Sequence, residues 1–216
     1  REIITQENTW EKSVIAFLEE QLLQDSNNIL LLKALFEIYM QSHELHDLNI
    51  AEKYLQKLNT INPDYLDPVY IADLYIHNSY FDKAISQLKF ITSNNKHYIN
   101  AIIKIAEIYQ YIQKDNSKAI RFYIIAYENN HLQSTIKLLY LLLNNQQKYS
   151  SKISTIISNK FVNLYDNYQI DLTKILKKYL SNTNYNYTYR KQISHVLDNN
   201  LDKVKSNDLK KKIGII

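Results

Sequence analysis

The chain has 216 residues, of which 45% are apolar and 22% are charged, and such proportions are typical of a globular protein with a substantial core. It contains one Gly and two Pro. Because sheets and hairpins usually depend on Gly-containing turns, this composition favours helices joined by Asn, Ser and Asp loops. The absence of Cys excludes disulfides, thiolate metal sites and Cys nucleophiles, and fits a reducing or an oxidising compartment equally well.

Charge is divided unevenly along the chain, although the net charge is only +4. Residues 1–100 hold 8 Lys/Arg and 14 Asp/Glu, a net charge of −6, and residues 101–216 hold 18 and 8, a net charge of +10. This asymmetry predicts two electrostatically different surfaces. The sequence contains no run of about 18 apolar residues, so it predicts no transmembrane helix. Its first residues lack the pattern of a cleavable signal. The chain begins with Arg1 rather than Met, which is compatible with removal of a targeting segment or a further domain.

Apolar residues recur at helical spacing along nearly the whole chain, as in Ile102, Ile105 and Tyr109, and this pattern predicts amphipathic helices. Asn pairs separate the apolar stretches at 27–28, 94–95, 129–130 and 144–145. Because Asn tolerates the left-handed backbone conformation, we expect it to close helices in place of Gly. The predicted helices cover 10–24, 29–42, 47–60, 67–77, 80–93, 97–113, 116–129, 132–144, 150–165, 170–180 and 187–212, the last with a break near Asn199.

Four alanines recur at a nearly constant interval: Ala16, Ala51, Ala84 and Ala119 lie 35, 33 and 35 residues apart. Periods of this size are typical of helical repeat proteins. A small residue at a fixed place lets paired helices approach closely, and positions four and seven residues later extend the same buried face. After the last three alanines these positions hold Leu55/Leu58, Leu88/Ile91 and Tyr123/Ala126.

A second motif, an acid two residues before a tyrosine, repeats in phase with the alanines. It occurs at intervals of 36 and 34 residues, as Glu37/Tyr39, Asp73/Tyr75 and Glu107/Tyr109. In two of the three copies a small residue also stands three positions before the tyrosine, as Ala72 and Ala106. These features resemble the tetratricopeptide (TPR) family, whose unit of about 34 residues is two antiparallel helices.

Residues 105–139 resemble the related Sel1-like repeat still more closely. IAEIY stands for the family's leucine–glycine–x–x–tyrosine, and DNSKAIRFYIIAYENN follows the rest of its framework, with Asn130 at the Gly position. The resemblance implies an all-α fold: an α-solenoid of antiparallel helix pairs, wound as a right-handed superhelix, with a helical C-terminal cap. Within it we expect a capping helix or partial repeat over 1–28, TPR/Sel1-like repeats over 29–144 and an irregular helical region over 145–216.

In this family the first helix of each repeat lines a concave groove, and the resemblance places the three acids there. It implies a non-catalytic protein–protein interaction scaffold that binds a partner peptide or helix, in roles such as bacterial assembly, the envelope or host interaction. A ladder of acids favours a basic partner. The alternative is solvated charges with local partners, since Lys33 precedes Glu37 by four residues and Lys104 precedes Glu107 by three. The implied groove residues are Leu30, Lys33, Glu37, Met40, Val69, Asp73, Ile76, Ile103 and Glu107.

The basic C-terminal half supports a different hypothesis, a nucleic-acid-binding helical repeat protein. Aromatic residues interleaved with cations can stack on single-stranded bases while neutralising phosphate. The candidate contacts are Tyr185, Tyr187, Tyr189, Arg190 and Lys191, flanked by Lys174, Lys177 and Lys178 and by Lys210, Lys211 and Lys212. A third hypothesis joins the two halves: the acidic groove of one copy receives the basic C-terminal region of another, in a salt-sensitive self-association.

Enzyme hypotheses find little support in the motifs. The sequence HELHD supplies His43, His46 and Asp47, but it is not the helical H-E-x-x-H zinc motif, and structural zinc normally needs four ligands. The single Gly, Gly214, rules out a Gly-rich phosphate loop. We interpret the only tryptophan, Trp10, as core packing. We therefore expect no catalytic activity, no metal and no cofactor.

Overall fold

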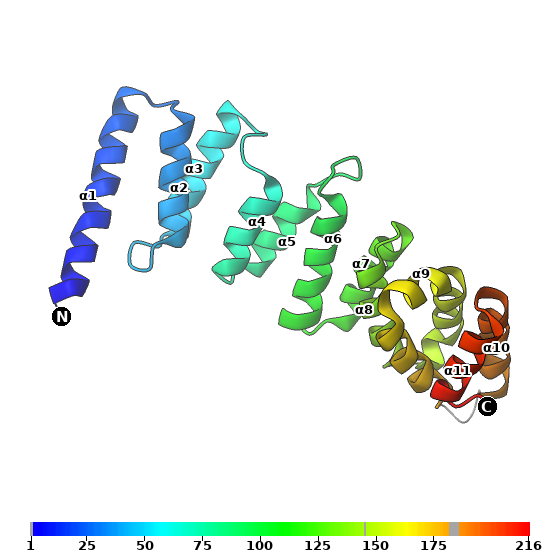
Figure 1. The fold of residues 1–216 in the computed structure, drawn as a ribbon. Helices are drawn as coiled ribbons and strands as arrows, with labels where there is room; N and C mark the ends of the chain where they lie inside the picture. The colour runs from blue at the N-terminus through cyan, green and yellow to red at the C-terminus, as the bar shows by residue number, and fades with distance from the viewer. Residues whose placement is uncertain (1, 145, 182–185) are drawn as a thin grey trace. The chain divides into compact units, whose positions relative to one another are not determined.

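The computed structural model describes residues 2–144, 146–181 and 186–216, and the regular elements in these ranges are all helical (Figure 1). The expected all-α fold is thus confirmed for the described residues. None of the described helices combines the length and the apolar character that crossing a membrane requires. The elements are α1 (Glu2–Gln24), α2 (Ile29–Gln41), α3 (Leu48–Ile61), α4 (Pro68–His77), α5 (Phe81–Lys89), α6 (Tyr98–Glu107), the π-helix η1 (Ile108–Ile112), α7 (Asn116–Glu128), α8 (Leu132–Leu143), α9 (Gln146–Leu180), α10 (Asn186–Asn200) and α11 (Lys203–Ile213).

Most helix ends lie within two residues of the predicted positions, but α1 begins at Glu2 rather than at residue 10, α5 ends at Lys89 rather than at residue 93, and α9 begins at Gln146 rather than at residue 150. Helix α9 runs through the gap predicted between 165 and 170, but its backbone leaves the helical region at Tyr168 (φ −138°, ψ 41°), so the predicted interruption is a kink. The break predicted near Asn199 lies at residues 201–202, where the Asp202 side chain accepts the Lys205 N–H (2.9 Å) and begins α11.

Asn residues end α3, α4, α7 and α8, as Asn62, Asn78, Asn129 and Asn144, but the backbone of these four residues is not left-handed. Asn130 has the expected left-handed conformation (φ 63°) after α7. Asn28, in contrast, has an extended backbone, and its side chain accepts the N–H groups of Leu30 and Leu31, so it begins α2. Ser79 and Lys114 take the left-handed conformation in two other connections. The short polar side chain of Asn can serve at either end of a helix, so its presence does not identify which end.

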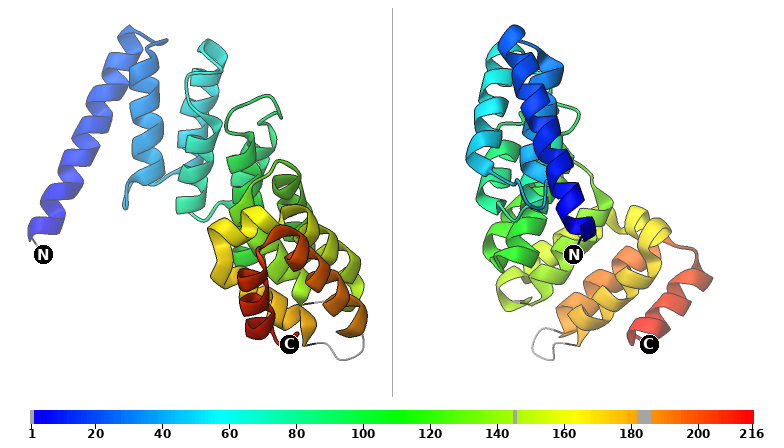
Figure 2. Two further views of the ribbon diagram at one scale, coloured as in Figure 1. Left: turned by 45° about the vertical axis from the view of Figure 1, so that its right-hand side comes forward. Right: turned by 90° about the vertical axis from the view of Figure 1, so that its left-hand side faces the viewer.

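The chain forms two compact units, unit 1 over residues 1–97 and unit 2 over residues 98–216. In unit 1, α1 packs along α2, α2 packs against α3 and also contacts α4, and α4 packs against α5 (Figures 1 and 2). Its most deeply buried apolar side chains include Leu32, Leu35, Phe36, Leu58 and Leu88. In unit 1 each helix therefore packs against the next one in the chain, except that α4 packs against α2 rather than α3.

Unit 2 begins with the same kind of pairing and ends in a different arrangement. Helix α6 packs against α7, α7 against α8, and α8 against α9, whereas α10 and α11 both contact α9 and also each other (Figure 2). Its fully buried side chains include Tyr123, Leu138, Leu139, Phe161 and Tyr179. The shorter helices α10 and α11 thus both pack against the long helix α9.

The periodic residues hold equivalent places in three helix pairs. The alanines of α3, α5 and α7 have no exposed surface, and the apolar residues four and seven positions after each are also buried. The carbonyl oxygen of each repeated tyrosine accepts the backbone N–H of the residue that precedes the following helix. These bonds join Asp47 to Tyr39 (3.1 Å), Tyr80 to Tyr75 (2.8 Å) and Asp115 to Tyr109 (2.8 Å).

Two departures from this pattern are local. Ala16 is exposed, because α1 turns its neighbour Ile15 (7% exposed) inward instead. Between Tyr109 and Asp115 there is one residue more than between Tyr75 and Tyr80. The π-helix η1 occupies this place, with a Gln113 N–H to Ile108 carbonyl bond of 3.0 Å, and its wider turn absorbs the extra residue.

Candidate functional site

A hollow between α1 and α2 is the site in unit 1 that best suits a partner side chain. It encloses about 400 Å³, and we call it the Trp10 hollow. Its surface is mostly apolar, and the described lining residues include two carboxylates and no cation. They are Trp10, Glu11 and Val14 from α1, Ala34, Glu37, Ile38 and Gln41 from α2, and Ser42 after α2.

The surface position of Trp10 corrects the prediction of a core residue. Its side chain is 68% exposed, and that of Phe17, seven positions later, is 58% exposed. Val14 lies between them at helical spacing and is half-buried. Helix α1 has two apolar stripes, one through Ile15 toward α2 and one through Trp10 and Phe17, and the second faces outward. A large exposed aromatic side chain beside a hollow is typical of a binding surface.

Glu37 supplies one of the two carboxylates, and two groups hold it in place. The Tyr70 hydroxyl, from α4, donates a hydrogen bond to it, and the Lys33 ammonium lies 3.6 Å away in a partly exposed i,i+4 pair. Burial, the hydrogen bond to Glu37 and the charge of Glu37 together raise the pKa of Tyr70 to about 12. The predicted Lys33–Glu37 pair is thus confirmed, and the hydroxyl of Tyr70 is a second partner that local spacing did not reveal.

Glu11 supplies the second carboxylate at the opposite wall. It accepts a hydrogen bond of 2.6 Å from the Ser42 hydroxyl, whose oxygen in turn accepts the Leu45 N–H (3.0 Å). This chain of bonds connects α1 to the residues that follow α2. Each carboxylate of the hollow therefore accepts a hydrogen bond from a neutral hydroxyl, and Glu37 is in addition paired with the Lys33 ammonium.

The other predicted groove residues of unit 1 are divided between surface and core. Leu30 is 69% exposed, Asp73 is exposed, and Val69 and Ile76 are half-buried. Met40 has no exposed surface, so its assignment to the groove floor is wrong. It follows Phe36, which is also fully buried, by four residues, and residues at this spacing share a helix face.

The third acid of the motif lies in unit 2, where it has a partner that sequence spacing did not predict. The Glu107 carboxylate accepts a bond of 2.5 Å from the Lys137 ammonium of α8, and Ile103 is half-buried one turn earlier. Two of the three acids are therefore engaged with a residue about 30 positions further along the chain. A continuous ladder through both units stays a prediction.

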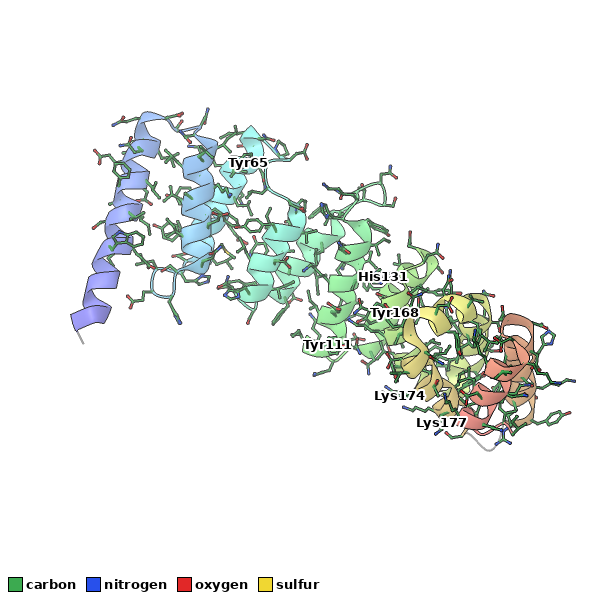
Figure 3. The ribbon with its side chains drawn as sticks, viewed as in Figure 1. Tyr65, Tyr111, His131, Tyr168, Lys174 and Lys177 are labelled. Carbon is green, nitrogen blue, oxygen red and sulfur yellow. The ribbon has the colours of Figure 1, made fainter. Side chains whose placement is uncertain are left out.

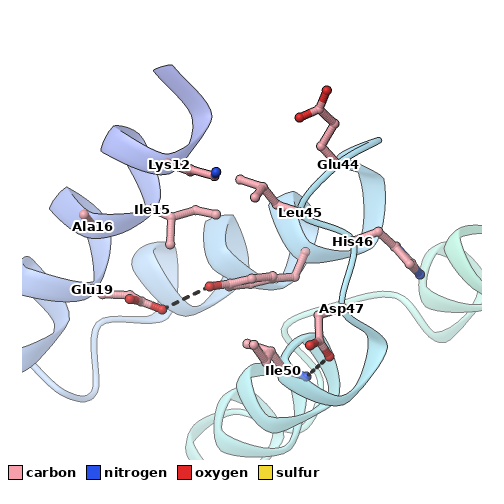
Figure 4. Close-up of a pocket in the computed structure, with 10 residues that line it drawn as sticks. Lys12, Ile15, Ala16, Glu19, Glu44, Leu45, His46, Asp47 and Ile50 are labelled. Carbon is pink, nitrogen blue, oxygen red and sulfur yellow. Dashed lines mark hydrogen bonds between the residues drawn. The ribbon is translucent and has the colours of Figure 1, made fainter. Parts of the chain in front are cut away.

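A second hollow of about 430 Å³ lies on the other side of α1, against the connection from α2 to α3 (Figure 4). Two of its three carboxylates already serve the fold. Glu19 accepts hydrogen bonds from the hydroxyls of Tyr39 (3.3 Å) and Tyr54 (2.8 Å), and Asp47 accepts the Ile50 N–H (3.0 Å) at the start of α3. The described lining of this hollow also includes a cation, Lys12, so the Trp10 hollow is the better candidate for a basic partner.

The HELHD motif also has structural roles. His46 stacks on Tyr80, with ring centroids 5.8 Å apart; its Nε2 lies 2.9 Å from the Tyr80 hydroxyl and its Nδ1 lies 3.2 Å from the Met40 carbonyl oxygen. Asp47 caps α3, and His43 is exposed. Among the described residues, no three His, Asp or Glu side chains come together in a way that could hold a metal ion.

Of the five predicted nucleic-acid contacts, three are exposed, one is buried and one lies outside the described residues. Tyr189 is only 9% exposed and stacks on Tyr179 at 4.6 Å between ring centroids, so its assignment as a base-stacking residue is wrong. Tyr187 is 82% exposed, Arg190 and Lys191 are exposed, and Tyr185 lies outside the described residues. Of the two described tyrosines in this set, only Tyr187 has a ring that is exposed and could stack on a base.

Sequence reasoning found Glu37 but missed the rest of the Trp10 hollow. The signal was present in the spacing of Trp10, Val14 and Phe17, which marks a second apolar face on α1. Comparisons of the chain with models of protein families, with curated proteins and with solved structures give no match.

Proposed function

We propose that the protein is a non-catalytic binding scaffold of TPR/Sel1-like helix pairs, arranged as an α-solenoid, and that unit 1 binds a basic, amphipathic helix or peptide in the Trp10 hollow. The observation that carries this proposal is the hollow itself. It combines an exposed tryptophan, an apolar lining and two carboxylates with no cation among its described lining residues. Apolar side chains with a few fixed polar groups are the usual construction of a recognition site.

Three equivalent helix pairs support the repeat architecture. The same alanine is fully buried in α3, α5 and α7, and the same tyrosine carbonyl accepts the N–H that precedes each of these helices. Burial of the same residue and formation of the same loop hydrogen bond at intervals of 33–36 residues are what a structural repeat of this length requires. Each pair exposes its first helix for binding in the family that the sequence resembles.

The chemistry of the hollow specifies its partner. An apolar side chain of the partner would cover Trp10, Val14 and Ile38 and supply most of the affinity by removing them from water. A Lys or Arg would meet Glu37, replacing Lys33, whose bond is long at 3.6 Å. Tyr70 holds the Glu37 carboxylate in place before binding, so little side-chain ordering has to accompany the new contact.

The single tryptophan gives a direct assay, because Trp10 is the only one in the chain. A helical peptide of Leu and Lys, with the apolar residues on one face, should shift Trp10 emission to shorter wavelength in a saturable way. A peptide in which Glu replaces Lys should not bind. Equal responses to both peptides, or no response to the basic one, would contradict the proposal.

Variants identify the carboxylates that select the basic peptide. Glu37→Gln and Glu11→Gln should each weaken binding severalfold and reduce its salt dependence, since charges of this kind act mainly on orientation and encounter. Asp64→Asn is the matched control, because Asp64 is exposed in unit 1 and does not line the hollow. A loss of affinity in Asp64→Asn as large as in Glu37→Gln would show that the acid surface acts as a whole rather than through the hollow.

A further inference from the structure

The two units of the chain carry opposite net charges. Unit 1 holds 8 Lys/Arg and 14 Asp/Glu, a net charge of −6, and unit 2 holds the remaining 18 and 8, a net charge of +10. The change of sign predicted from sequence halves therefore coincides with a boundary between compact bodies. Opposite charges on separate bodies provide long-range attraction between different copies of one chain, and this attraction weakens with salt.

Three exposed cations of unit 2 lie together near the end of α9. Lys174, Lys177 and Lys178 stand at positions i, i+3 and i+4, so they share one face of the helix. We call this surface the basic end (Lys174 and Lys177 are labelled in Figure 3).

Five other cations of unit 2 make ion pairs with acidic residues, whereas the cations of the basic end make none among the described residues. Lys137 pairs with Glu107, Lys118 with Asp115, and Lys212 with Asp208. Lys210, which the sequence placed with the basic surface, is only 9% exposed and pairs with Asp198. The basic end makes no such ion pair within the described structure, so its charge is available to an acidic surface.

An apolar group accompanies these charges. Ile170, one turn before Lys174 on α9, is 73% exposed. A helix face with exposed cations and an exposed isoleucine has the composition that the Trp10 hollow requires of its partner. It offers little to single-stranded nucleic acid, because Tyr189 is buried against Tyr179 and cannot stack on a base.

We propose that the basic end of one copy docks in the Trp10 hollow of a second copy, so that the protein associates head to tail. This inference rests on the proposed function, and it identifies the partner of the Trp10 hollow as a second copy of the same chain. The two surfaces differ, so the contact is heterologous: each copy keeps one free hollow and one free basic end, and chains grow unless the rotation closes a ring. Association is expected at low salt and is lost at about 1 M salt, where the Debye length is about 3 Å.

Two variants block one surface each. Trp10→Lys places a cation in the hollow at an exposed position of α1, and the triple variant Lys174→Glu, Lys177→Glu and Lys178→Glu reverses the charge of the basic end on the outer face of α9. Sedimentation at low salt should show growing assemblies for the unchanged protein and monomers for either variant alone. An equimolar mixture should form a dimer and stop there, because one hollow and one basic end remain intact.

The same mixture has a specific optical signal. The Trp10→Lys variant contains no tryptophan, so any emission comes from Trp10 of the triple variant, whose hollow receives the intact basic end. Mixing should shift this emission to shorter wavelength. A control triple variant, Lys148→Glu, Lys203→Glu and Lys205→Glu, changes three exposed cations of unit 2 outside the basic end and should still self-associate. If it does not, net charge rather than the basic end drives association and the inference is overturned.

Other outcomes also decide the matter. An unchanged protein that stays monomeric at low salt and high concentration overturns the inference, and if its Trp10 emission still responds to the basic peptide, the proposed function stands alone. If the Lys174/Lys177/Lys178 variant loses binding to phosphatidylserine vesicles or to a single-stranded oligonucleotide while self-association is unchanged, the basic end serves a different anionic ligand and the inference is again overturned.

Discussion

Tyrosine hydroxyls link one helix to another through carboxylates at several places in this protein. Tyr39 and Tyr54 share Glu19, Tyr70 bonds to Glu37 and Tyr75 bonds to Glu52 (3.1 Å). In unit 2, Tyr140 bonds to Asp171 (3.1 Å). Part of the tyrosine content, 19 residues in all, thus has a structural use beyond apolar packing, because each phenol covers apolar surface and satisfies a charged acceptor.

These bonds predict a specific loss of stability in alkali. Burial and the adjacent Glu37 raise the pKa of Tyr70 from 10.0 to about 12, and burial and neighbouring carboxylates also raise the pKa values of Tyr39 and Tyr75. The folded protein therefore retains these protons to higher pH than the unfolded chain. Their contribution is fully present below pH 10 and is lost as the pH rises toward 12 and above.

Tyr70→Phe tests this linkage. The variant should be less stable than the unchanged protein at pH 8, by up to about 1 kcal/mol for the lost hydrogen bond. Its free energy of unfolding should then fall less between pH 10 and pH 12, since one titrating group is gone. Urea unfolding across this range measures both effects. Tyr187→Phe, at an 82% exposed ring, is the control and should match the unchanged protein throughout.

The repeated alanine predicts a second pair of outcomes at the residue scale. Ala84 has no exposed surface where α5 packs against α4, and Ala84→Leu should lower the free energy of unfolding by about 1–3 kcal/mol through overpacking. Ala16 has the same place in the sequence period but is exposed, so Ala16→Leu should change stability by less than about 0.5 kcal/mol. Equal losses in urea unfolding would show that the two alanines are packed alike.

At the scale of single elements, the last helix is held by one acid of the preceding helix. Asp198 of α10 accepts hydrogen bonds from the Lys210 ammonium (2.7 and 2.9 Å) and from the Ser206 hydroxyl (2.9 Å), both on α11. The hydrogen bonds from Lys210 and then Ser206 lower the pKa of Asp198. A lowered pKa contributes stability above the unfolded value of about 3.9, and this contribution is lost as the pH falls below it.

Asp198→Asn should therefore loosen α11 at neutral pH and remove its sensitivity to acid. Amide hydrogen exchange of residues 203–213 should be faster than in the unchanged protein at pH 7, and should change less between pH 6 and pH 3 after correction for the intrinsic rate. Asp208→Asn is the control, because Asp208 pairs with Lys212 inside α11 and both side chains are more than half exposed. Similar exchange in the two variants would contradict the assigned role of Asp198.

Helix positions could be predicted from sequence because they depend on local features. Near-absence of Gly and Pro, apolar spacing and Asp or Asn caps specify helices without knowledge of their neighbours. Which face of a helix is buried depends on its neighbours. On α1, the stripes through Ile15 and through Trp10 are both apolar, and only the packing of α2 decides between them.

The candidate site was predictable to the same limited extent. Glu37 follows from its repeat position, but its bond to Tyr70 joins residues 33 positions apart, and no local spacing indicates it. Met40 shows the limit of a face assignment. Met40 lies three residues after Glu37, about 60° away around the helix, and four residues after Phe36, about 40° away. It is buried together with Phe36, the nearer of the two residues.

For the whole molecule, the division into two units predicts unfolding in two steps. Each unit has its own set of fully buried side chains: Leu35, Phe36 and Leu58 in unit 1, and Tyr123, Leu138 and Phe161 in unit 2. A body with its own core unfolds cooperatively by itself, so transitions of the two bodies coincide only if their stabilities are equal.

Trp10 and the buried alanines allow the two transitions to be separated. Tryptophan emission reports on unit 1 alone, whereas helical circular dichroism reports on both units, so urea curves from the two probes should not superimpose. Ala84→Leu should move the emission curve to lower urea. Ala119→Leu, at the equivalent fully buried position of α7, should leave the emission curve in place and move only the remaining part of the dichroism curve. If Ala119→Leu shifted the emission curve as far as Ala84→Leu does, the two units would unfold as one cooperative body, and binding at the Trp10 hollow would then stabilise unit 2 as well.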